Sequence, residues 1–133
     1  MLERLNPAGV HEPPGYSHVT ISPAGRLAHL AGQCPLDASG TVVGTDDYDA
    51  QTDQVIANCL AVLAAAGAKP ADVVRSVIYV VSADSAVLAG VWSRLLDSEL
   101  APAFSTASTL LGVTVLGFTG QLVEVDLTAA LPG

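Results

Sequence analysis

The clearest pattern in the chain is a helical repeat of apolar residues between positions 48 and 66. Apolar side chains recur there at intervals of three and four residues, so they gather on one face of a helix. Asp46 or Asp47 precedes this stretch and can accept hydrogen bonds from the free N–H groups of a first turn, and Gly67 follows it as a stop signal. The pattern predicts an amphipathic helix. Its apolar face consists of Val55, Ile56, Cys59, Leu60 and Leu63.

A second amphipathic helix is predicted after Asp84 or Ser85, either of which can cap it, and Pro102 closes the segment. Between the two helices, residues 72–82 are dense in β-branched side chains, as expected of a central strand covered on both sides. The apolar stripe of the second helix consists of Leu88, Val91, Trp92, Leu95 and Leu96.

Two strand-like segments precede the first helix. The stretch up to Gly15 is rich in proline and glycine, which predicts an irregular arm over residues 1–15. Residues 17–22 and 26–34 follow as strands, and the intervening Pro23-Ala24-Gly25 favours a turn. We therefore expect these two strands to form a hairpin.

Residues 100–123 carry no charged side chain, and a segment of this length would span a bilayer. Pro102 and several glycines divide it, which favours a pair of strands near 105–115 and 120–130 over a membrane helix. The resulting order is β-β-α-β-α-β-β. Because the connections are short, the helices must cover one face of a sheet. We expect one α+β domain over 1–133. The sheet face that the helices leave uncovered must be buried against something else.

Composition indicates what buries that face. Apolar residues make up 50% of the chain and charged residues only 14%, whereas roughly 25% charged residues is usual in soluble domains. A disordered chain would be richer in charge and poorer in apolar residues. With so few charged residues to cover the outside, we expect a second copy of the chain to cover part of it.

The net charge of −8 argues against polyanionic partners. Nucleic-acid binding depends on neutralising phosphates with Lys and Arg, so we expect no nucleic-acid partner and no membrane surface. The N-terminus has an acid and an early proline where a signal peptide needs a basic start and an apolar run, which favours a cytoplasmic location. The five basic residues are scattered: Arg4, Arg26, Lys69, Arg75 and Arg94.

The two cysteines, Cys34 and Cys59, lie in apolar runs without the spacing of a metal site. We interpret them as buried thiols in a reducing compartment rather than as a disulfide. No metal site is predicted.

Five segments, in order along nearly the whole chain, carry a resemblance to a known family. They are PPGYSH at 13–18, LAGQCPLD at 30–37, AAGAKPADVV at 65–74, STLLGV at 108–113 and GQLVEVD at 120–126. Together they resemble the RidA/YjgF (Rid) family, whose best-known members are imine deaminases. The resemblance implies a chorismate-mutase-like fold, with a mixed sheet backed by two helices. It also implies a homotrimer with a central barrel and ligand pockets at the subunit interfaces.

The family's deaminases hydrolyse 2-aminoacrylate-type enamines and imines to 2-keto acids and ammonia, with no metal or organic cofactor. In them an arginine on the strand before the last holds the substrate carboxylate, a task for which the planar guanidinium is suited. Aligning STLLGV places Ser108 at this position, whereas anchoring on Pro102-Ala103 places Phe104 there. No Lys or Arg follows Arg94, so the usual carboxylate clamp is absent.

Other positions of the implied pocket also differ from the family. Its serine before Gly-Gln is Ala31, its pocket cysteine corresponds to Leu110, and its helix asparagine falls near Ala89 or Gly90. Gly32, whose backbone is free of a side chain, is retained.

The remaining substrate-binding candidates suit a neutral ligand. Ser108 and Thr109 can replace the guanidinium with hydroxyl contacts, the alternative being ordinary strand residues. Trp92 and Phe104 can line an enlarged apolar pocket, although a tryptophan in a helical apolar stripe is more often part of the core.

Glu124 and Tyr16 are the catalytic candidates. Hydrolysis of an imine needs a water delivered to carbon and a proton delivered to nitrogen, and one carboxyl in a partly dry pocket can do both in turn. The alternative is that Glu124 and Asp126, two apart on one strand, form only a solvated polar face. Tyr16 can bind a ligand through its hydroxyl or close the pocket; alternatively it is a packed aromatic.

The three histidines are weaker candidates. His18 can act as an acid or base near neutral pH, but a structural role is favoured. His11 and His29 have no partner at a useful spacing and are interpreted as without a role.

These residues predict a homotrimer that hydrolyses a reactive imine or enamine lacking the usual α-carboxylate. The alternative is a non-catalytic protein that binds a small metabolite in the same pocket, with Glu124 as an orienting contact. Ribonuclease activity, which an older family name suggests, is not favoured by the acidic charge.

Overall fold

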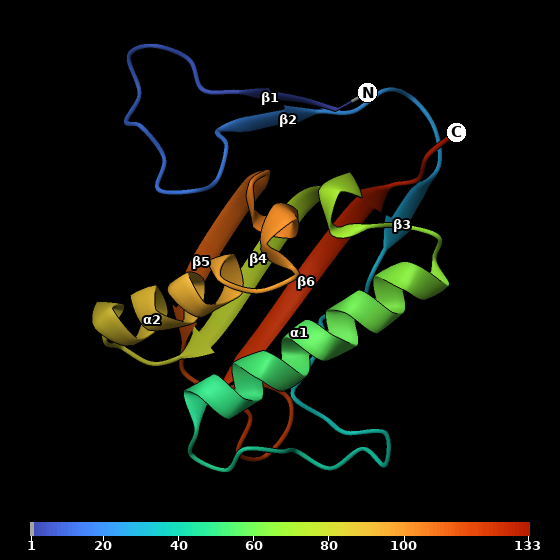
Figure 1. Cartoon of the computed structure of the whole chain (residues 1–133). Helices are drawn as coiled ribbons and strands as arrows, with labels where there is room; N and C mark the ends of the chain where they lie inside the picture. Colours follow the sequence, from blue (N-terminus) through green and yellow to red (C-terminus); the bar gives the residue numbers. More distant parts are fainter. Residues whose placement is uncertain (1) are drawn as a thin grey trace.

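A four-stranded mixed sheet lies against two helices in the computed structural model, which describes residues 2–133 (Figure 1). The strand order is β3-β6-β4-β5, with β5 parallel to β4 and β6 antiparallel to both β4 and β3. This architecture confirms the predicted α+β fold class. The strands are β3 (Leu27–His29), β4 (Val73–Val81), β5 (Ala107–Val113) and β6 (Val123–Ala130).

Both predicted helices are present and cover the same face of the sheet (Figure 1). The first, α1 (Tyr48–Ala65), begins after Asp47, whose carboxylate accepts a hydrogen bond from the Ala50 N–H. It ends before Gly67, which adopts a positive φ of 81°. The second, α2 (Ser85–Leu96), is capped by Asp84 in the same way. The core between helices and sheet includes Val55, Cys59, Leu63, Ile78, Val80, Leu95, Val125 and Leu127, all fully buried.

Within residues 2–133, no helix covers the opposite face of the sheet (Figure 1). Along β6, Val123, Val125 and Leu127 point toward the helices, so the alternating Glu124 and Asp126 point to the other side. This open sheet face also presents exposed apolar side chains: Leu111 is 40% exposed and Leu27 is 45% exposed.

The predicted hairpin of residues 17–34 is wrong. Its first strand, β2 (Val19–Ile21), pairs with β1 (Glu3–Leu5) in a separate two-stranded sheet, and β3 pairs with β6. Side-chain contacts explain this placement, because the Thr20 hydroxyl contacts Thr106 and accepts a hydrogen bond from the Ala107 N–H. These contacts hold β2 at the start of β5 rather than beside β3. The N-terminal arm, predicted to be irregular, therefore contains a short strand.

The uncharged segment 100–123 folds into a short helix, η2 (Ala101–Phe104), the strand β5 and the turn that leads into β6. Within residues 2–133, no helix has the length and apolarity needed to cross a membrane. The strand prediction is confirmed, but β5 and β6 are not paired with each other, because β4 lies between them.

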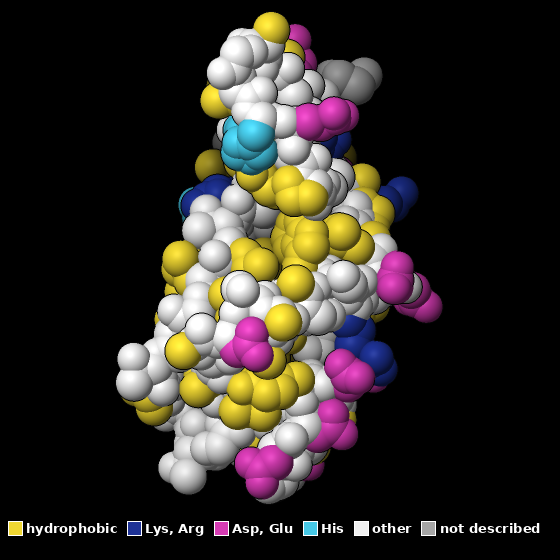
Figure 2. All heavy atoms as spheres, turned by 90° about the vertical axis from the view of Figure 1, so that its left-hand side faces the viewer, with side chains coloured by type: hydrophobic (Ala, Val, Ile, Leu, Met, Phe, Trp, Pro, Cys, Tyr) yellow, Lys and Arg dark blue, Asp and Glu magenta, His cyan; other side chains and the backbone are white. Residues whose placement is uncertain are grey.

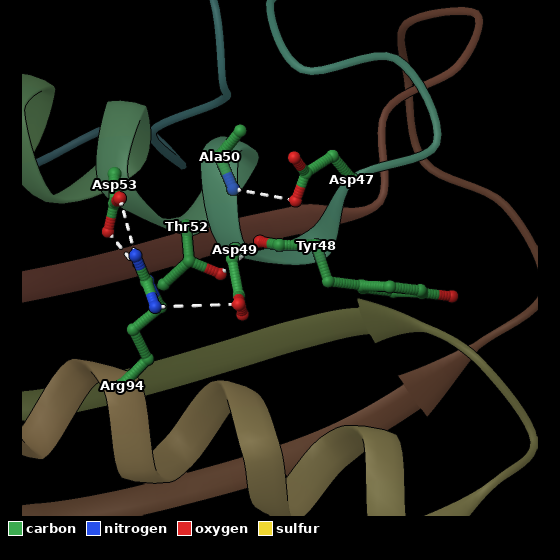
Figure 3. A network of polar contacts seen from close by, with 7 residues as sticks. All are labelled: Asp47, Tyr48, Asp49, Ala50, Thr52, Asp53 and Arg94. Carbon is green, nitrogen blue, oxygen red and sulfur yellow. Dashed lines mark hydrogen bonds and ion pairs between the residues drawn. The ribbon is translucent and has the colours of Figure 1, made fainter.

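Arg94 joins the two helices at the surface (Figure 3). From α2, its Nε and Nη2 donate to the two carboxylate oxygens of Asp53 on α1, both at 2.8 Å, and its Nη1 lies 3.4 Å from Asp49. The hydrogen bonds from Arg94 lower the pKa of Asp53 below its ordinary value of 3.8.

Replacing Arg94 by alanine is expected to lower the melting temperature at pH 7 by no more than about 4 °C, because exposed ion pairs contribute little. A lowered carboxyl pKa stabilises the fold above about pH 4, and this contribution is lost as the pH falls through the folded-state value. The difference between wild type and Arg94→Ala should therefore shrink below about pH 4 in thermal unfolding followed by circular dichroism. A difference that persists unchanged at pH 3 would contradict this account.

Candidate functional site

The candidate residues form two groups, and the first surrounds a cavity of about 270 Å³ beside β5. We call it the apolar pocket. Trp92 reaches it from α2, Ser108 and Leu110 from the helix-facing side of β5, and Tyr16 from the loop before β2. Figure 2 views this side of the molecule and shows apolar side chains gathered in the middle of it, below the N-terminal arm. Its lining consists of Pro14, Tyr16, Trp92, Ser108 and Leu110.

Aromatic rings form the wall of the pocket and connect it to the core. The ring of Trp92 stands edge-on to Tyr16 and to Phe104, with centroid distances of 6.3 and 5.9 Å. Its Nε1 donates a 3.0 Å hydrogen bond to the Pro14 carbonyl oxygen, which fixes the indole. Phe104 is fully buried behind Trp92 and does not line the cavity. Of the two residues aligned with the family arginine, only Ser108 therefore faces the pocket.

The polar atoms of the pocket are already bonded within the protein. The Ser108 hydroxyl accepts a 2.6 Å hydrogen bond from Ser76 and donates to the Thr106 carbonyl oxygen at 3.0 Å. Tyr16 Oη shares a 2.6 Å hydrogen bond with His11 Nε2. No Lys or Arg is among the lining residues. The pocket thus offers apolar walls and no positive charge.

Two cations on the neighbouring elements α2 and β4 are engaged away from the pocket. Arg94 is bonded to the acids of α1, and Arg75 of β4 donates a 2.6 Å hydrogen bond to the Thr109 hydroxyl. Because Thr109 alternates with Ser108 along β5, this Arg75 contact belongs to the open sheet face.

The second group surrounds Glu124 on β6. Its Oε1 accepts hydrogen bonds from the Cys34 thiol at 3.3 Å and from Gln121 Nε2 at 3.0 Å. Its Oε2 lies against Gly32, where a β-carbon would overlap the carboxylate. Burial and the neighbouring Glu124 raise the pKa of the Cys34 thiol to about 11. Ala31, next to Gly32, is exposed.

The chain does not bring the two groups into one cavity. Ser108 lies on the helix-facing side of β5, whereas Glu124 lies on the open side of β6, and β4 separates the two strands. Tyr79 of β4 is opposite Glu124 in register and opposite Leu111 on its other side. One copy of the chain therefore holds the carboxylate and the apolar pocket apart.

The structure changes the interpretation of the histidines and cysteines. His11 has a partner after all, because the turn around Gly15, with a φ of 101°, brings it to Tyr16. His18 donates from Nε2 to the His11 carbonyl oxygen at 2.7 Å, in keeping with a structural role. Both cysteines are free, but only Cys59 is buried; Cys34 is half-exposed beside Glu124.

Two residues beside Glu124, Cys34 and Gln121, were not among the sequence candidates. Cys34 reaches Glu124 only because the Gln33–Val125 bridge aligns two segments that are distant in the chain. Within residues 2–133 no group of three or more His, Cys, Asp or Glu side chains is placed to hold a metal ion.

Comparison with known proteins places this fold in a defined class. Residues 10–131 match the family described as Endoribonuclease L-PSP. The chain is 39% identical to YyfB of the conserved Rid protein family from Yersinia pestis, over 98% of both chains, with a TM-score of 0.88. A member of the YjgF/YER057c/UK114 family from Mycobacterium tuberculosis is 26% identical, covering 98% of this chain and all of that one, with a TM-score of 0.64.

A further relative is the protein DfrA from Myxococcus xanthus, which is 39% identical over 64 residues. That match spans about half of each protein, 48% of this chain and 49% of DfrA. The class these comparisons define is that of small α+β proteins with two helices on one face of a mixed sheet. The chain belongs to the RidA/YjgF (Rid) family.

Proposed function

We propose that this protein hydrolyses imines or enamines that carry no carboxylate on the nitrogen-bearing carbon. The observation that carries the proposal is the apolar pocket, where Ser108, one of the two residues that align with the family's arginine, is hydrogen-bonded to Ser76 and Thr106. A substrate carboxylate there would lose its water without gaining a cation, which is costly. At about 270 Å³ the pocket suits a small neutral molecule.

The aromatic wall of the pocket indicates which kind of side chain the substrate carries. Trp92 and Tyr16 present ring faces and edges rather than free donors, because the Trp92 N–H and the Tyr16 hydroxyl are bonded to Pro14 and His11. Such walls favour flat or branched apolar groups. The proposed substrate is therefore an imine bearing an apolar, preferably aromatic, side chain.

Glu124 supplies the acid and base of the proposed reaction. Its carboxylate takes a proton from a water molecule as the water oxygen bonds to the imine carbon. It then returns the proton to the nitrogen, which gives a carbinolamine. The same carboxylate moves the hydroxyl proton of that intermediate to the nitrogen, the carbonyl forms as the carbon–nitrogen bond breaks, and ammonia leaves. The balance is one imine and one water to one carbonyl compound and one ammonia, with no electron transfer. An enamine enters the same route after tautomerising to the imine, in which a proton from water is added to its terminal carbon and one leaves its nitrogen.

A second copy of the chain is needed to complete this site. Glu124 and the apolar pocket lie on opposite sides of one subunit's sheet, and the open sheet face exposes Leu27 and Leu111 beside charged residues. We propose a homotrimer in which the open faces meet, so that Glu124 of one copy approaches the apolar pocket of the next. Trimers with a central barrel are what the family resemblance implies.

The family description as an endoribonuclease finds little support in this chain's charges. The net charge is −8. Arg94 is paired with two acids and Arg75 is bonded to Thr109. A surface of this kind repels a phosphate backbone.

The proposal is tested by ammonia release from two freshly generated imines that differ only in the carboxylate. L-amino acid oxidase forms one from phenylalanine, and a flavin amine oxidase forms the other from 2-phenylethylamine. We expect the protein to accelerate hydrolysis of the neutral imine by at least about tenfold more than that of the carboxylated one. Light scattering should give about three times the 13.5 kDa chain mass.

If the trimeric protein accelerates the hydrolysis of neither imine, the proposed hydrolase activity is wrong. The alternative of a non-catalytic protein that binds a small metabolite would then be favoured. A stronger effect on the carboxylated imine would overturn the proposed substrate class. A monomeric mass in light scattering at micromolar concentration would overturn the proposal that two copies of the chain share the site.

A further inference from the structure

Glu124 is held on one side only. Both of its hydrogen bonds within residues 2–133 go to Oε1, from the Cys34 thiol and from Gln121 Nε2. Oε2 accepts none within that range and rests against the backbone of Gly32. The carboxylate therefore has one oxygen fixed by the protein and one oxygen left free.

Gln121 is a rigid support for this arrangement. Its side chain is 3% exposed, and its Nε2 also donates to the Val123 carbonyl oxygen at 3.1 Å. Its Oε1 accepts a 3.2 Å hydrogen bond from the Phe118 N–H. With donor and acceptor both engaged, the amide cannot turn without breaking several bonds at once.

Cys34 can support Glu124 only as a protonated thiol. Its S–H is the donor in the 3.3 Å contact; the Gly32 carbonyl oxygen, a second acceptor, is farther away at 3.6 Å. The pKa of about 11 keeps the proton on sulfur at neutral pH. Of the charged groups in residues 2–133, Glu124 is the one whose charge acts on this thiol.

From this geometry we infer that Cys34 and Gln121 are positioning residues, which bind Oε1 of Glu124 and reserve Oε2 for proton transfer. The inference rests on the proposed function of Glu124. A carboxylate free to rotate would present either oxygen in many orientations, and misplacement of a catalytic group lowers the rate. The neighbouring titratable groups on this face are Tyr79, opposite Glu124 in register on β4, and Asp126, two residues along β6.

The contact itself is tested without any enzyme assay, by alkylation of Cys34 with iodoacetamide as a function of pH. The Cys34→Ala variant measures the background from the buried Cys59. If Glu124 holds the thiol protonated, Glu124→Gln should raise the alkylation rate at pH 9 at least about threefold, because a thiolate then forms at lower pH. Asp126→Asn, two residues away on the same strand face, should leave the rate unchanged. Equal rates in wild type and Glu124→Gln would overturn the contact.

The positioning role is tested by kinetics of Cys34→Ala and Cys34→Ser on the neutral imine. We expect Cys34→Ala to lower kcat about fivefold with little change in KM, as for loss of one hydrogen bond to a charged group. Serine retains a donor and should restore kcat in large part.

Equal impairment of both variants would assign Cys34 a merely structural role. Full activity in Cys34→Ala would also overturn the inference. If the wild type hydrolyses no imine, the proposed function fails and the positioning role with it, while the alkylation rates still decide whether the contact exists.

Discussion

The Glu124→Gln variant is expected to lose imine hydrolysis by a factor of about 100 to 10,000 in kcat. An amide cannot accept a proton from water at neutral pH, so the step that forms the carbon–oxygen bond loses its base. The substitution adds no heavy atom, so the close approach to Gly32, where no β-carbon fits, is preserved. The measurement is ammonia release from the neutral imine, with circular dichroism to confirm that the fold is retained.

Asp126→Asn is the matched control for this variant. Asp126 lies two residues along β6 on the same open face and makes no hydrogen bond to Cys34 or Gln121 within residues 2–133. Its replacement should change kcat by less than about threefold, because it removes a charge from this face without touching the hydrogen bonds that hold Glu124. Comparable losses in both variants would indicate that the face needs its negative charge, and that no single carboxylate performs the chemistry.

Local signals made the helices predictable from sequence. The first helix was expected over 48–66 and spans Tyr48–Ala65, because its cap at Asp47 and its stop at Gly67 depend only on neighbouring residues. The strand β4 was found for a similar reason, since a run of β-branched residues is typical of a strand buried within a sheet.

Strand pairing was not predictable in the same way. A proline- and glycine-containing link between residues 17–22 and 26–34 is compatible with a hairpin. It is equally compatible with a turn between two strands that do not pair with each other. The pairing of β2 with β1 depends on contacts between Thr20 and residues near 106, which lie far away in the sequence. The insertion of β4 between β5 and β6 is likewise a property of the whole sheet.

The site was predictable in part. Tyr16, Trp92, Ser108 and Leu110 were individually named from the sequence and line one pocket in the structure. The partners of Glu124 were not named, because Cys34 is 90 positions away from it and no periodicity connects the two. Tertiary contacts of this kind have no local signature.

The Ser108→Arg variant is expected to reverse the substrate preference of the pocket. A guanidinium projecting from β5 would meet a substrate carboxylate in a bidentate pair, and hydrogen bonds to charged groups contribute about 1.5–3 kcal/mol. This corresponds to about a 10- to 150-fold rise in kcat/KM for the phenylalanine-derived imine relative to the neutral one. The neutral imine should also lose rate, since the longer side chain occupies part of a cavity of about 270 Å³.

Ser108→Met separates charge from volume, because methionine fills a similar space without a cation. Both variants remove the hydrogen bond that Ser76, fully buried, donates to Ser108, so both should be destabilised by about 1–3 kcal/mol. The ratio of the two kcat/KM values cancels this shared loss and isolates the guanidinium. If methionine shifts the ratio as much as arginine does, the size of the pocket governs the choice of substrate. If only arginine shifts it, the absence of a positive charge at position 108 is what excludes carboxylated imines from this pocket.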